Sequence, residues 1–407
     1  MAGAMTGARE GGASECPASI DIAIIGGGGM GSACAYWLKL MGPPELAVTV
    51  FEADPGYARA ATTLAAGGIR QQFSTPENIL MSQFGFEFLT GAAQALGVEG
   101  HDVDLGVHQT PYLHLASGDD LAGLRASFDL QASLGSAPEW LDQSALAGRF
   151  PWLRTDDVEA AVLGGPREGT FDPPGLLAAM RRKAIALGAR YVAGEVEGIE
   201  LGADGRVAAI RCNAARIACG RAINAAGPAA GRVAAMAGVD LPIIPVRAHT
   251  FVFRAEQPLP GPVPIVVDQV QLLNFRAEGP TFLAGTPREG GLDDAGDDFA
   301  IDYDLFESLI WPMLAARVPA FEAIRFAGAW VGHMEWSRLD ANPIVGPHPE
   351  IDNFMFVAGF SGHGAQHIPA AGRAIAELVL DGGYRSIDLS RFGYERVRAG
   401  APYPELF

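Results

Sequence analysis

The most constraining feature of the sequence is a glycine run that directly follows a short apolar segment near the N-terminus. Residues 20–25 read Ile-Asp-Ile-Ala-Ile-Ile, a pattern typical of a buried parallel strand, and helical spacing begins at Ser32. Between them, residues 26–31 satisfy the pattern GxGxxG. Such glycines permit a tight turn, a close approach of backbone to a pyrophosphate, and close packing of helix on sheet. The residues expected to bind a dinucleotide there are Gly26, Gly28, Gly29, Met30 and Gly31.

The next predicted strand ends at an acidic residue that completes this motif. Residues 47–51 have strand character and lead into Glu52, roughly 20 residues after the last glycine of the motif. A carboxylate at that strand end, with Ala53 beside it, suits the ribose hydroxyls of an adenosine and disfavours the 2′-phosphate of NADP. A structural turn is the alternative for any glycine run, but the ordered set favours dinucleotide binding. The motif alone does not separate FAD from NAD.

Length and element order favour more than one folding unit. The chain has 407 residues, of which 49% are hydrophobic, whereas single cores stop growing near ~250–300 residues. Helical patterns over 75–96 and 302–314 alternate with strand-like runs, and those at 248–254, 264–274 and 281–285 fit an antiparallel sheet. We expect a cofactor-binding domain at 19–106, 158–243 and 327–390, a substrate domain at 107–157 and 244–326, and a C-terminal tail at 391–407.

Composition excludes several classes of partner. The net charge of −18 repels nucleic-acid phosphate and anionic lipid, so neither is an expected partner. Residues 1–18 are rich in glycine and alanine and lack a signal-peptide core, which predicts a disordered lead-in and a cytoplasmic location. No uncharged apolar run reaches the ~18 residues that a membrane-spanning helix needs. The four cysteines form no CxxC pair, and we expect reduced thiols and no metal site.

A second glycine cluster lies near the other end of the chain. Residues 359–369 separate a predicted strand at 354–358 from a predicted helix at 370–380. Such a loop presents backbone amides and the positive end of a helix dipole to an anion. At the pyrimidine edge of an isoalloxazine, that positive end would stabilise the negative charge of reduced flavin. An ordinary turn between strand and helix is the alternative.

With both glycine clusters in place, the sequence resembles the D-amino-acid-oxidase-type (DAO) flavoproteins, which include sarcosine oxidase, glycine oxidase and dimethylglycine dehydrogenase. The resemblance covers residues 20–385, and it is carried by the N-terminal motif with Glu52 and by segments 65–68, 223–227, 340–346 and 359–372. A narrower likeness, at 67–74, 76–79 and 346–349, is to the FAD-dependent oxidoreductase-domain proteins associated with mitochondrial complex I assembly.

The resemblance implies a fold and a set of cofactor contacts. The fold is α/β (α+β), a Rossmann-like FAD-binding domain of the glutathione-reductase type with an inserted antiparallel-sheet substrate domain. By position, the glycine motif and Glu52 would hold ADP, and two segments would lie along the flavin. The further residues expected to bind FAD are Ala66, Gly67, Gly68, Ala226, Gly227, Gly362, His363, Gly364 and Gln366.

Departures from the family pattern bear on the cofactor and on oxygen. Sarcosine oxidases tether flavin through a cysteine where this chain has His333, and dimethylglycine dehydrogenases use a histidine near the position of Leu64, so we expect non-covalent FAD. Sarcosine oxidases also carry an oxygen-activating lysine in the substrate sheet. Residues 184–407 contain no lysine, which leaves open whether O₂ or another electron acceptor is used.

The resemblance implies hydride transfer to flavin N5 from a carbon beside an amine nitrogen. The expected substrate is a secondary or N-methyl amino acid, whose carboxylate calls for a fixed guanidinium. Arg70 is the first candidate because it follows the segment expected along the flavin, and Arg276, Arg247 and Arg288 are the others. His333 is the third expected catalytic residue with Arg70 and Arg276. For each arginine a surface charge is the alternative, and for His333 a core histidine.

Two other functions remain open from the sequence. The same fold supports an FAD-dependent dehydrogenase of 2-hydroxy acids, and fold does not fix substrate. The narrower likeness also allows an FAD-binding assembly or scaffold protein without turnover.

Overall fold

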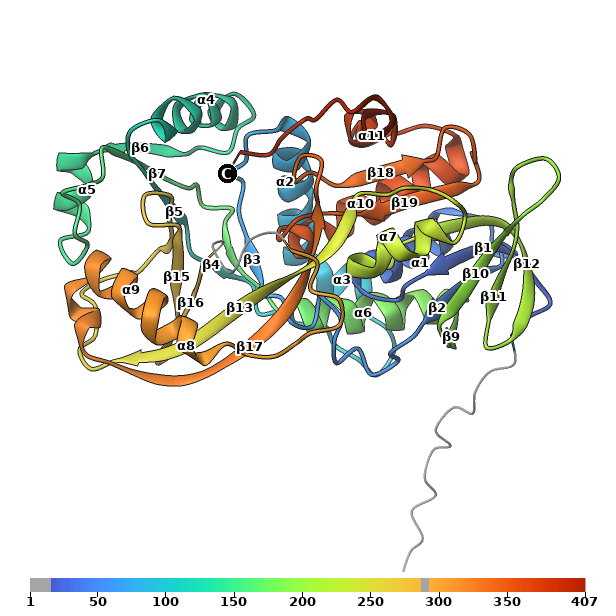
Figure 1. Cartoon of the computed structure of the whole chain (residues 1–407), viewed down its shortest axis with the longest axis horizontal. Helices are drawn as coiled ribbons and strands as arrows, with labels where there is room; N and C mark the ends of the chain where they lie inside the picture. Colours follow the sequence, from blue (N-terminus) through green and yellow to red (C-terminus); the bar gives the residue numbers. More distant parts are fainter. Residues whose placement is uncertain (1–15, 287–292, 407) are drawn as a thin grey trace, which may run out of the picture.

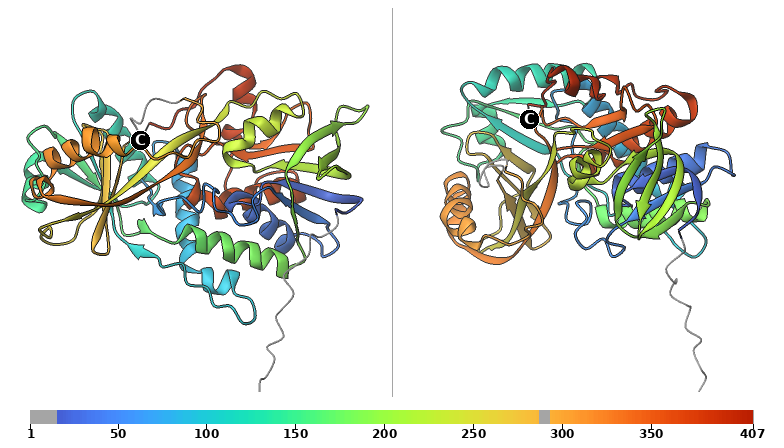
Figure 2. Two further views of the ribbon diagram at one scale, coloured as in Figure 1. Left: turned by 60° about the horizontal axis from the view of Figure 1, so that its bottom comes forward. Right: turned by 45° about the vertical axis from the view of Figure 1, so that its right-hand side comes forward.

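The computed structural model describes residues 16–286 and 293–406. These residues form two eight-stranded sheets and one three-stranded sheet. The two large sheets lie side by side along the long axis of the molecule (Figures 1 and 2). Most of the lead-in expected at 1–18 lies outside the described residues. Among the described helices, none is both long and apolar enough to cross a bilayer.

The first sheet is built around the N-terminal motif. β1 pairs in parallel with β2 on one side and with β12 on the other, and β12 pairs in parallel with β19. The last four residues of β1 are buried, as expected for a parallel strand that is covered on both faces. Its strands are β1 (Ser19–Ile25), β2 (Val48–Glu52), β9 (Arg190–Ala193), β10 (Val196–Leu201), β11 (Val207–Cys212), β12 (Ala215–Asn224), β18 (Ile344–Pro347) and β19 (Phe354–Ala358).

Three helices pack together against this sheet, and α1 contacts both of the others (Figure 1). The approach of α1 to α10 depends on Gly372, where an added Cβ would lie 2.5 Å from the Cβ of Ala33. The three are α1 (Gly29–Met41), α6 (Pro173–Ala186) and α10 (Gly364–Asp381). The remaining helices of this part are α2 (Pro76–Thr90), α3 (Ala92–Leu96), η1 (Gly227–Ala229), α7 (Ala230–Ala235), η4 (Ser390–Phe392) and α11 (Glu395–Ala399).

The second sheet has the strand order β17-β13-β16-β15-β14-β5-β7-β6. All its pairs are antiparallel except β14 with β5, so the sheet is mixed rather than purely antiparallel as expected. Its strands are β17 (Ile324–Ser337), β13 (Ile243–Ala255), β16 (Thr281–Gly285), β15 (Leu273–Glu278), β14 (Ile265–Asp268), β5 (Tyr112–Ala116), β7 (Ala160–Leu163) and β6 (Glu139–Asp142). Buried phenylalanines fill its core, among them Phe251, Phe253, Phe275 and Phe321.

Short helices and a small sheet complete the architecture. The helices near the second sheet are α4 (Asp120–Ser133), α5 (Gln143–Arg149), α8 (Tyr303–Leu305), the π-helical turn η2 (Phe306–Ile310), α9 (Trp311–Arg317) and η3 (Pro319–Glu322). The three-stranded sheet consists of β3 (Gly68–Ile69), β8 (Gly169–Thr170) and β4 (His108–Gln109). β3 directly follows the segment that the sequence places along the flavin.

Several boundaries differ from the sequence-based expectations. β7 and β17 belong to the second sheet, so the domain boundaries expected at 158 and 327 are wrong there. The helix expected over 75–96 breaks at Gly91, and the run at 264–274 contains parts of two strands, β14 and β15. Helix α10, expected to begin near 370, begins at Gly364 and contains Pro369.

The C-terminal segment, expected to be a tail, packs on the part of the molecule that contains the first sheet (Figure 1). Arg396 Nε donates to Asp340 Oδ2 at 2.7 Å, and both side chains are buried. Farther along, the Glu405 carboxylate accepts hydrogen bonds from the hydroxyl groups of Ser74 and Thr75 at the start of α2. These bonds tie the chain end to the helix that follows Arg70.

Candidate functional site

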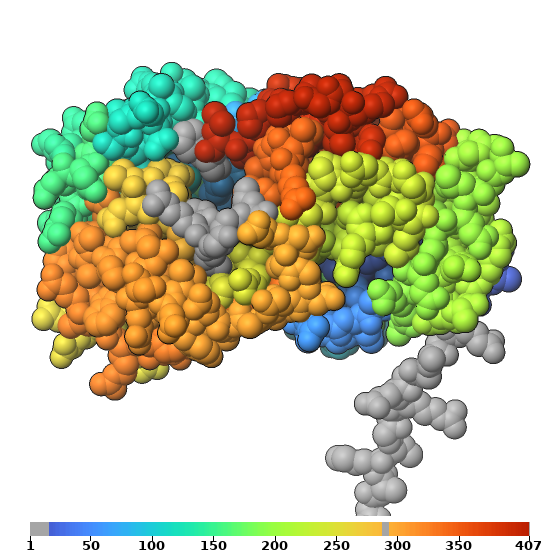
Figure 3. Space-filling view, viewed as in Figure 1, coloured from blue at the N-terminus to red at the C-terminus, as the bar shows by residue number. Residues whose placement is uncertain are grey.

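Two cavities meet in the middle of the molecule. The first, about 380 Å³, lies at the carboxyl ends of β1 and β2. The second, about 500 Å³, lies between two glycine segments, residues 65–68 and 361–366, and the second sheet. Met30, Thr62 and His333 line both cavities, so the two are adjacent. The surface is hollowed between the 227–236 region and the segment ending near 300 (Figure 3). Together the adjacent cavities suit an elongated ligand.

The three glycines of the motif have different structural environments. Gly26 has a φ of +98°, and an added Cβ would lie 2.5 Å from the carbonyl oxygen of Ala225. At Gly31 a Cβ would lie 1.9 Å from the Gly26 oxygen, so helix and strand touch there. At Gly28 an added Cβ meets no atom within 4 Å, and the residue lines the first cavity. This arrangement fits a pyrophosphate that approaches the backbone at Gly28.

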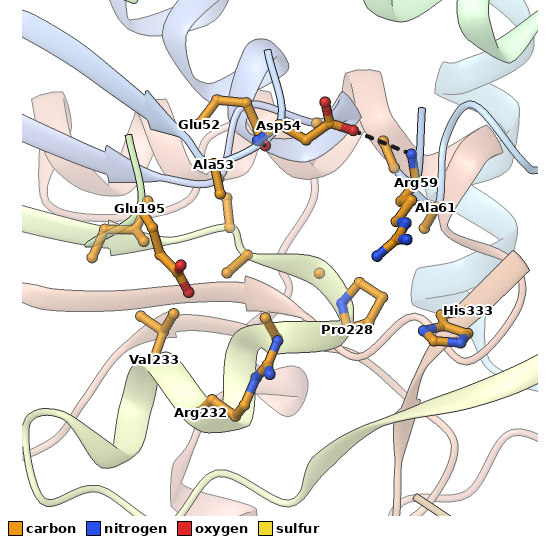
Figure 4. Close-up of a pocket in the computed structure, with 18 of the residues that line it drawn as sticks. Glu52, Ala53, Asp54, Arg59, Ala61, Glu195, Pro228, Arg232, Val233 and His333 are labelled. Carbon is orange, nitrogen blue, oxygen red and sulfur yellow. Dashed lines mark hydrogen bonds between the residues drawn. The ribbon is translucent and has the colours of Figure 1, made fainter. Parts of the chain in front are cut away.

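Glu52 lies at the end of β2 with both carboxylate oxygens held by backbone. Its Oε2 accepts from the Gly27 amide at 2.7 Å, and its Oε1 accepts from the Asp54 amide at 2.8 Å. Burial raises the pKa of Glu52 above its usual range, and the backbone donors oppose that rise. Glu52, Ala53 and Asp54 follow one wall of the first cavity (Figure 4). The carboxylate is positioned to receive sugar hydroxyls.

Two guanidinium groups that the sequence did not single out line the first cavity. Arg59 and Arg232 extend into it from different elements (Figure 4). The Arg59 guanidinium lies 5.2 Å from the ring centroid of Phe299, and Arg232 Nη2 is 3.8 Å from Asp297 Oδ1. Both are positive charges beside the predicted diphosphate position. No local pattern around either arginine distinguishes it from a surface charge.

The second cavity is lined by both glycine segments. Ala66, Gly67 and Gly68 form one stretch of its lining. Gly67 has a φ of +75° and an added Cβ would lie 2.3 Å from the Phe171 oxygen, while a Cβ on Gly68 would strike the Tyr112 hydroxyl at 1.9 Å. The residues that line it from the other segment are Ser361, Gly362, His363, Gly364, Ala365 and Gln366. Ala226 and Gly227 line the first cavity instead.

His363 and Gln366, both in the second glycine segment, have different surroundings. Burial and the charge of Arg70 lower the pKa of His363 to about 3, so its imidazole is neutral near pH 7. Its Nδ1 lies 3.4 Å from Nδ1 of His367. Gln366 Oε1 accepts from the Arg70 amide at 2.8 Å, which joins α10 to the segment around β3. The N-terminus of α10, at Gly364, therefore lies directly at the cavity wall.

The arginines predicted to bind substrate have unequal surroundings. Arg70 lines the second cavity, stacks 4.0 Å above the centroid of the Phe73 ring, and donates to the Gln72 carbonyl. Arg276 lines the same cavity, and its Nη2 donates to Glu278 at 2.9 Å. Its Nε is buried and has no hydrogen-bond partner among the described residues. An unpaired buried donor of this kind is costly unless a ligand satisfies it.

The other predicted groups lie elsewhere. Arg247 pairs with Asp298 at 2.9 Å at an exposed site, and Arg288 lies outside the described residues. His333 is at the junction of the two cavities, where its ring stacks on Phe299 at 3.8 Å and its Nε2 lies 2.6 Å from the Asp298 carbonyl oxygen.

A buried acid near the same junction was also missed by the sequence. Glu335 lines the second cavity, is 8% exposed, and has one carboxyl oxygen, Oε2, without a partner among the described residues. Burial raises its pKa to about 7.

These features together fit FAD. A glycine loop and an acidic residue suit ADP at one end, and two glycine-walled segments with a helix N-terminus suit a planar ring system at the other. At Gly67, Gly68 and Gly362 an added Cβ would lie within 3.0 Å of a neighbouring protein atom, so a side chain at any of them would force the cavity wall to shift.

Comparison with known proteins agrees with this geometry. Residues 21–378 match the family DAO, FAD dependent oxidoreductase. FAD-dependent oxidoreductase domain-containing protein 1 of Xenopus laevis is 37% identical over 96% of this chain and 85% of its own length. Glycine oxidase of Geobacillus kaustophilus is 25% identical over 88% of this chain and 92% of its own. The crystal structure of L-proline dehydrogenase from P. horikoshii has the same fold, with a TM-score of 0.82 and 24% identity, covering 95% of this chain and 100% of that one. The chain belongs to the DAO family of FAD-dependent oxidoreductases, and its cofactor is FAD.

Proposed function

We propose that this protein oxidises the C–N bond of a secondary or N-methyl amino acid. The observation that carries the proposal is Arg276, which lines the second cavity and whose buried Nε has no hydrogen-bond partner among the described residues. A substrate carboxylate supplies the acceptor that this donor lacks, in a charge-assisted hydrogen bond. When bound, FAD supplies the hydride acceptor for the carbon beside the amine nitrogen.

The cavity wall also suits an uncharged amine. Much of the lining is apolar, with Leu273, Phe275 and Leu283 contributed by neighbouring strands of the second sheet. Of the two acids in the lining, Asp268 is committed to Arg317 Nε at 2.6 Å. The other, Glu335, has its pKa raised to about 7 by burial. Few negative charges therefore stabilise an ammonium, which favours the neutral amine that hydride loss requires.

The contacts change the roles that the sequence assigned. Arg276 takes the first place as carboxylate anchor, ahead of Arg70, whose guanidinium already stacks on Phe73 and donates to a backbone carbonyl. His333 is held by Phe299 and Asp298 at the junction of the cavities, so we assign it a positioning role beside the cofactor rather than a role in substrate chemistry.

The test is an anaerobic titration of the FAD-loaded protein. The visible flavin absorbance is followed while N-methyl, cyclic and D-amino acids are added, and then 2-hydroxy acids. Bleaching by an amine supports the proposal. Bleaching by hydroxy acids alone would transfer it to a 2-hydroxy-acid dehydrogenase. A full FAD spectrum that no compound bleaches would favour an FAD-binding assembly or scaffold protein without turnover.

The anchor has its own variant. Arg276→Met is expected to raise the dissociation constant of a carboxylate substrate by about 10- to 100-fold, which corresponds to one hydrogen bond to a charged group. The same variant should change the dissociation constant of the corresponding amide by less than about 2-fold, because the amide lacks the charge. Arg254→Met, which removes an exposed arginine of the same sheet, is the matched control. Equal losses for acid and amide would remove Arg276 from the anchoring role.

A further inference from the structure

The Glu335 carboxyl belongs to the wall of the second cavity and lies close to the wall of the first. An added Cβ on Gly364, which lines the second cavity, would lie 3.3 Å from its Oε1. An added Cβ on Gly227, which lines the first cavity, would lie 3.7 Å from its Oε2. The carboxyl group therefore stands between a glycine of each cavity wall, and neither glycine has a side chain that shields it.

Only part of this carboxyl is satisfied by the protein. The backbone amides of Gly359 and Phe360 lower the pKa of the carboxyl group, against the larger effect of burial. The Glu335 carbonyl accepts from the Ser361 amide at 3.1 Å, so β17 is fixed to the second glycine segment. Oε2 is buried and has no hydrogen-bond partner among the described residues. Because an unsatisfied buried acceptor is costly, a donor from a bound ligand is expected at this point.

The order of groups in FAD decides which donor reaches it. Adenosine and pyrophosphate occupy the first cavity in the arrangement above, and the isoalloxazine occupies the second. The segment that crosses the junction is the ribityl chain, whose hydroxyl groups are hydrogen-bond donors. A phosphate at the same point has no hydrogen to donate to a carboxylate and would repel it.

We propose that Glu335 binds a ribityl hydroxyl of FAD and so fixes the linker between the two halves of the cofactor. Glu52 and Glu335 then play parallel parts, since backbone amides stabilise the charged form of each carboxyl group and each offers an oxygen to a polyol. Glu52 serves the ribose at one end, and Glu335 serves the ribityl chain at the junction. The inference rests on FAD binding and does not depend on the identity of the substrate.

The experiment combines variants of the protein with analogues of the cofactor. Apoprotein is titrated with FAD and with FAD analogues that lack the 2′-, 3′- or 4′-hydroxyl of the ribityl chain, and dissociation constants are measured from flavin fluorescence. Glu335→Leu is expected to raise the dissociation constant of FAD by about 10- to 100-fold. For one analogue the same substitution should change the dissociation constant by less than about 2-fold, because the hydroxyl that Glu335 binds is already absent.

Two further variants keep the result interpretable. Glu335→Gln retains an acceptor oxygen and should recover much of the affinity for FAD, also in the case that Glu335→Leu fails to fold. Glu52→Gln is the matched control, because it removes a carboxylate at the other end of the cofactor. It should raise the dissociation constants of FAD and of all three analogues by the same factor. If Glu335→Gln and Glu335→Leu weaken FAD and every analogue equally, Glu335 does not bind the ribityl chain.

Discussion

Alanine at two glycines of the same motif should separate folding from cofactor binding. At Gly31 an added Cβ would lie 1.9 Å from the Gly26 carbonyl oxygen, so α1 must move away from β1. Overpacking of this kind costs about 1–3 kcal/mol, only partly offset by the roughly 0.5–1 kcal/mol that alanine gains over glycine in a helix. At Gly28 the same atom meets nothing within 4 Å, so we expect the apoprotein stability to change by less than about 0.5 kcal/mol.

In the presence of FAD, Gly28→Ala is expected to be the more destabilising substitution of the two. Its methyl group stands where the pyrophosphate approaches. The same overpacking range of about 1–3 kcal/mol corresponds to roughly a 5- to 150-fold weaker dissociation constant. At an FAD concentration of 100 times the wild-type constant, wild type gains about 2.7 kcal/mol of stability from the ligand. A variant weakened about 100-fold gains only about 0.4 kcal/mol at that concentration.

Denaturant unfolding of apo and FAD-loaded protein measures both effects, and fluorescence titration gives the dissociation constants independently. Gly28→Ala should unfold like wild type without FAD and far more easily than wild type with it. Gly31→Ala should already be destabilised without FAD. If Gly28→Ala destabilises the apoprotein as much as Gly31→Ala does, or binds FAD normally, the assigned roles are wrong.

Two further predictions concern buried charges. Arg317→Met should lower the free energy of unfolding by about 3–5 kcal/mol, because Asp268 is left buried without its cation. Arg216→Met, which removes one partner of an exposed ion pair, should lower it by under about 1 kcal/mol in the same urea unfolding series. Similar losses for both variants would contradict this prediction. Burial raises the pKa of Glu168 from 4.5 to about 6, so its contribution to stability is complete below about pH 4.5 and is lost as the pH rises through 6. Between pH 4 and 7, wild type should therefore lose about 2 kcal/mol relative to Glu168→Gln, a difference that pH-dependent urea unfolding should reveal and that a constant offset would refute.

The sequence predicted the cofactor domain because its chemistry is local. Strand β1, the glycine turn, helix α1 and Glu52 are close together in the chain, and each step of the motif has a geometric reason that needs no distant contact. The fold class and FAD were confirmed for that reason. The second glycine cluster was also identified locally, although the helix after it begins at Gly364.

That helix shows why local rules set its start too late. Pro369 lacks the amide that an interior helical position supplies, which favours a later start. In the structure, packing outweighs this loss: Gly372 lies against Ala33 of α1, and the Pro369 carbonyl accepts from Trp37 Nε1 at 2.8 Å. The parallel pairing of β14 with β5 was missed for a related reason, since these strands are far apart in the chain and their register depends on the assembled sheet.

The residues around the junction of the cavities were the least predictable. Arg59, Arg232 and Glu335 come from different elements, and each has the sequence neighbourhood of an ordinary surface or strand residue. Each was singled out by what the fold places around it: glycines without side chains in the case of Glu335, and the first cavity in the case of the arginines (Figure 4). A pattern in one segment cannot contain that information.

The distribution of positive charge bears on the choice of electron acceptor. Lys39 and Lys183 are the only lysines of the chain, and their Nζ atoms donate to backbone carbonyl oxygens of Pro44 and Leu46 and of Gly97, respectively. Neither lysine lines the two cavities. His363 is neutral near pH 7, and the guanidinium groups of Arg70 and Arg276 and the N-terminus of α10 contribute positive charge at the second cavity. A guanidinium keeps its proton at every working pH, so it stabilises charge without relaying a proton. We therefore expect an electron acceptor other than O₂, and readmitting air to the bleached protein tests this through the rate at which the visible absorbance returns.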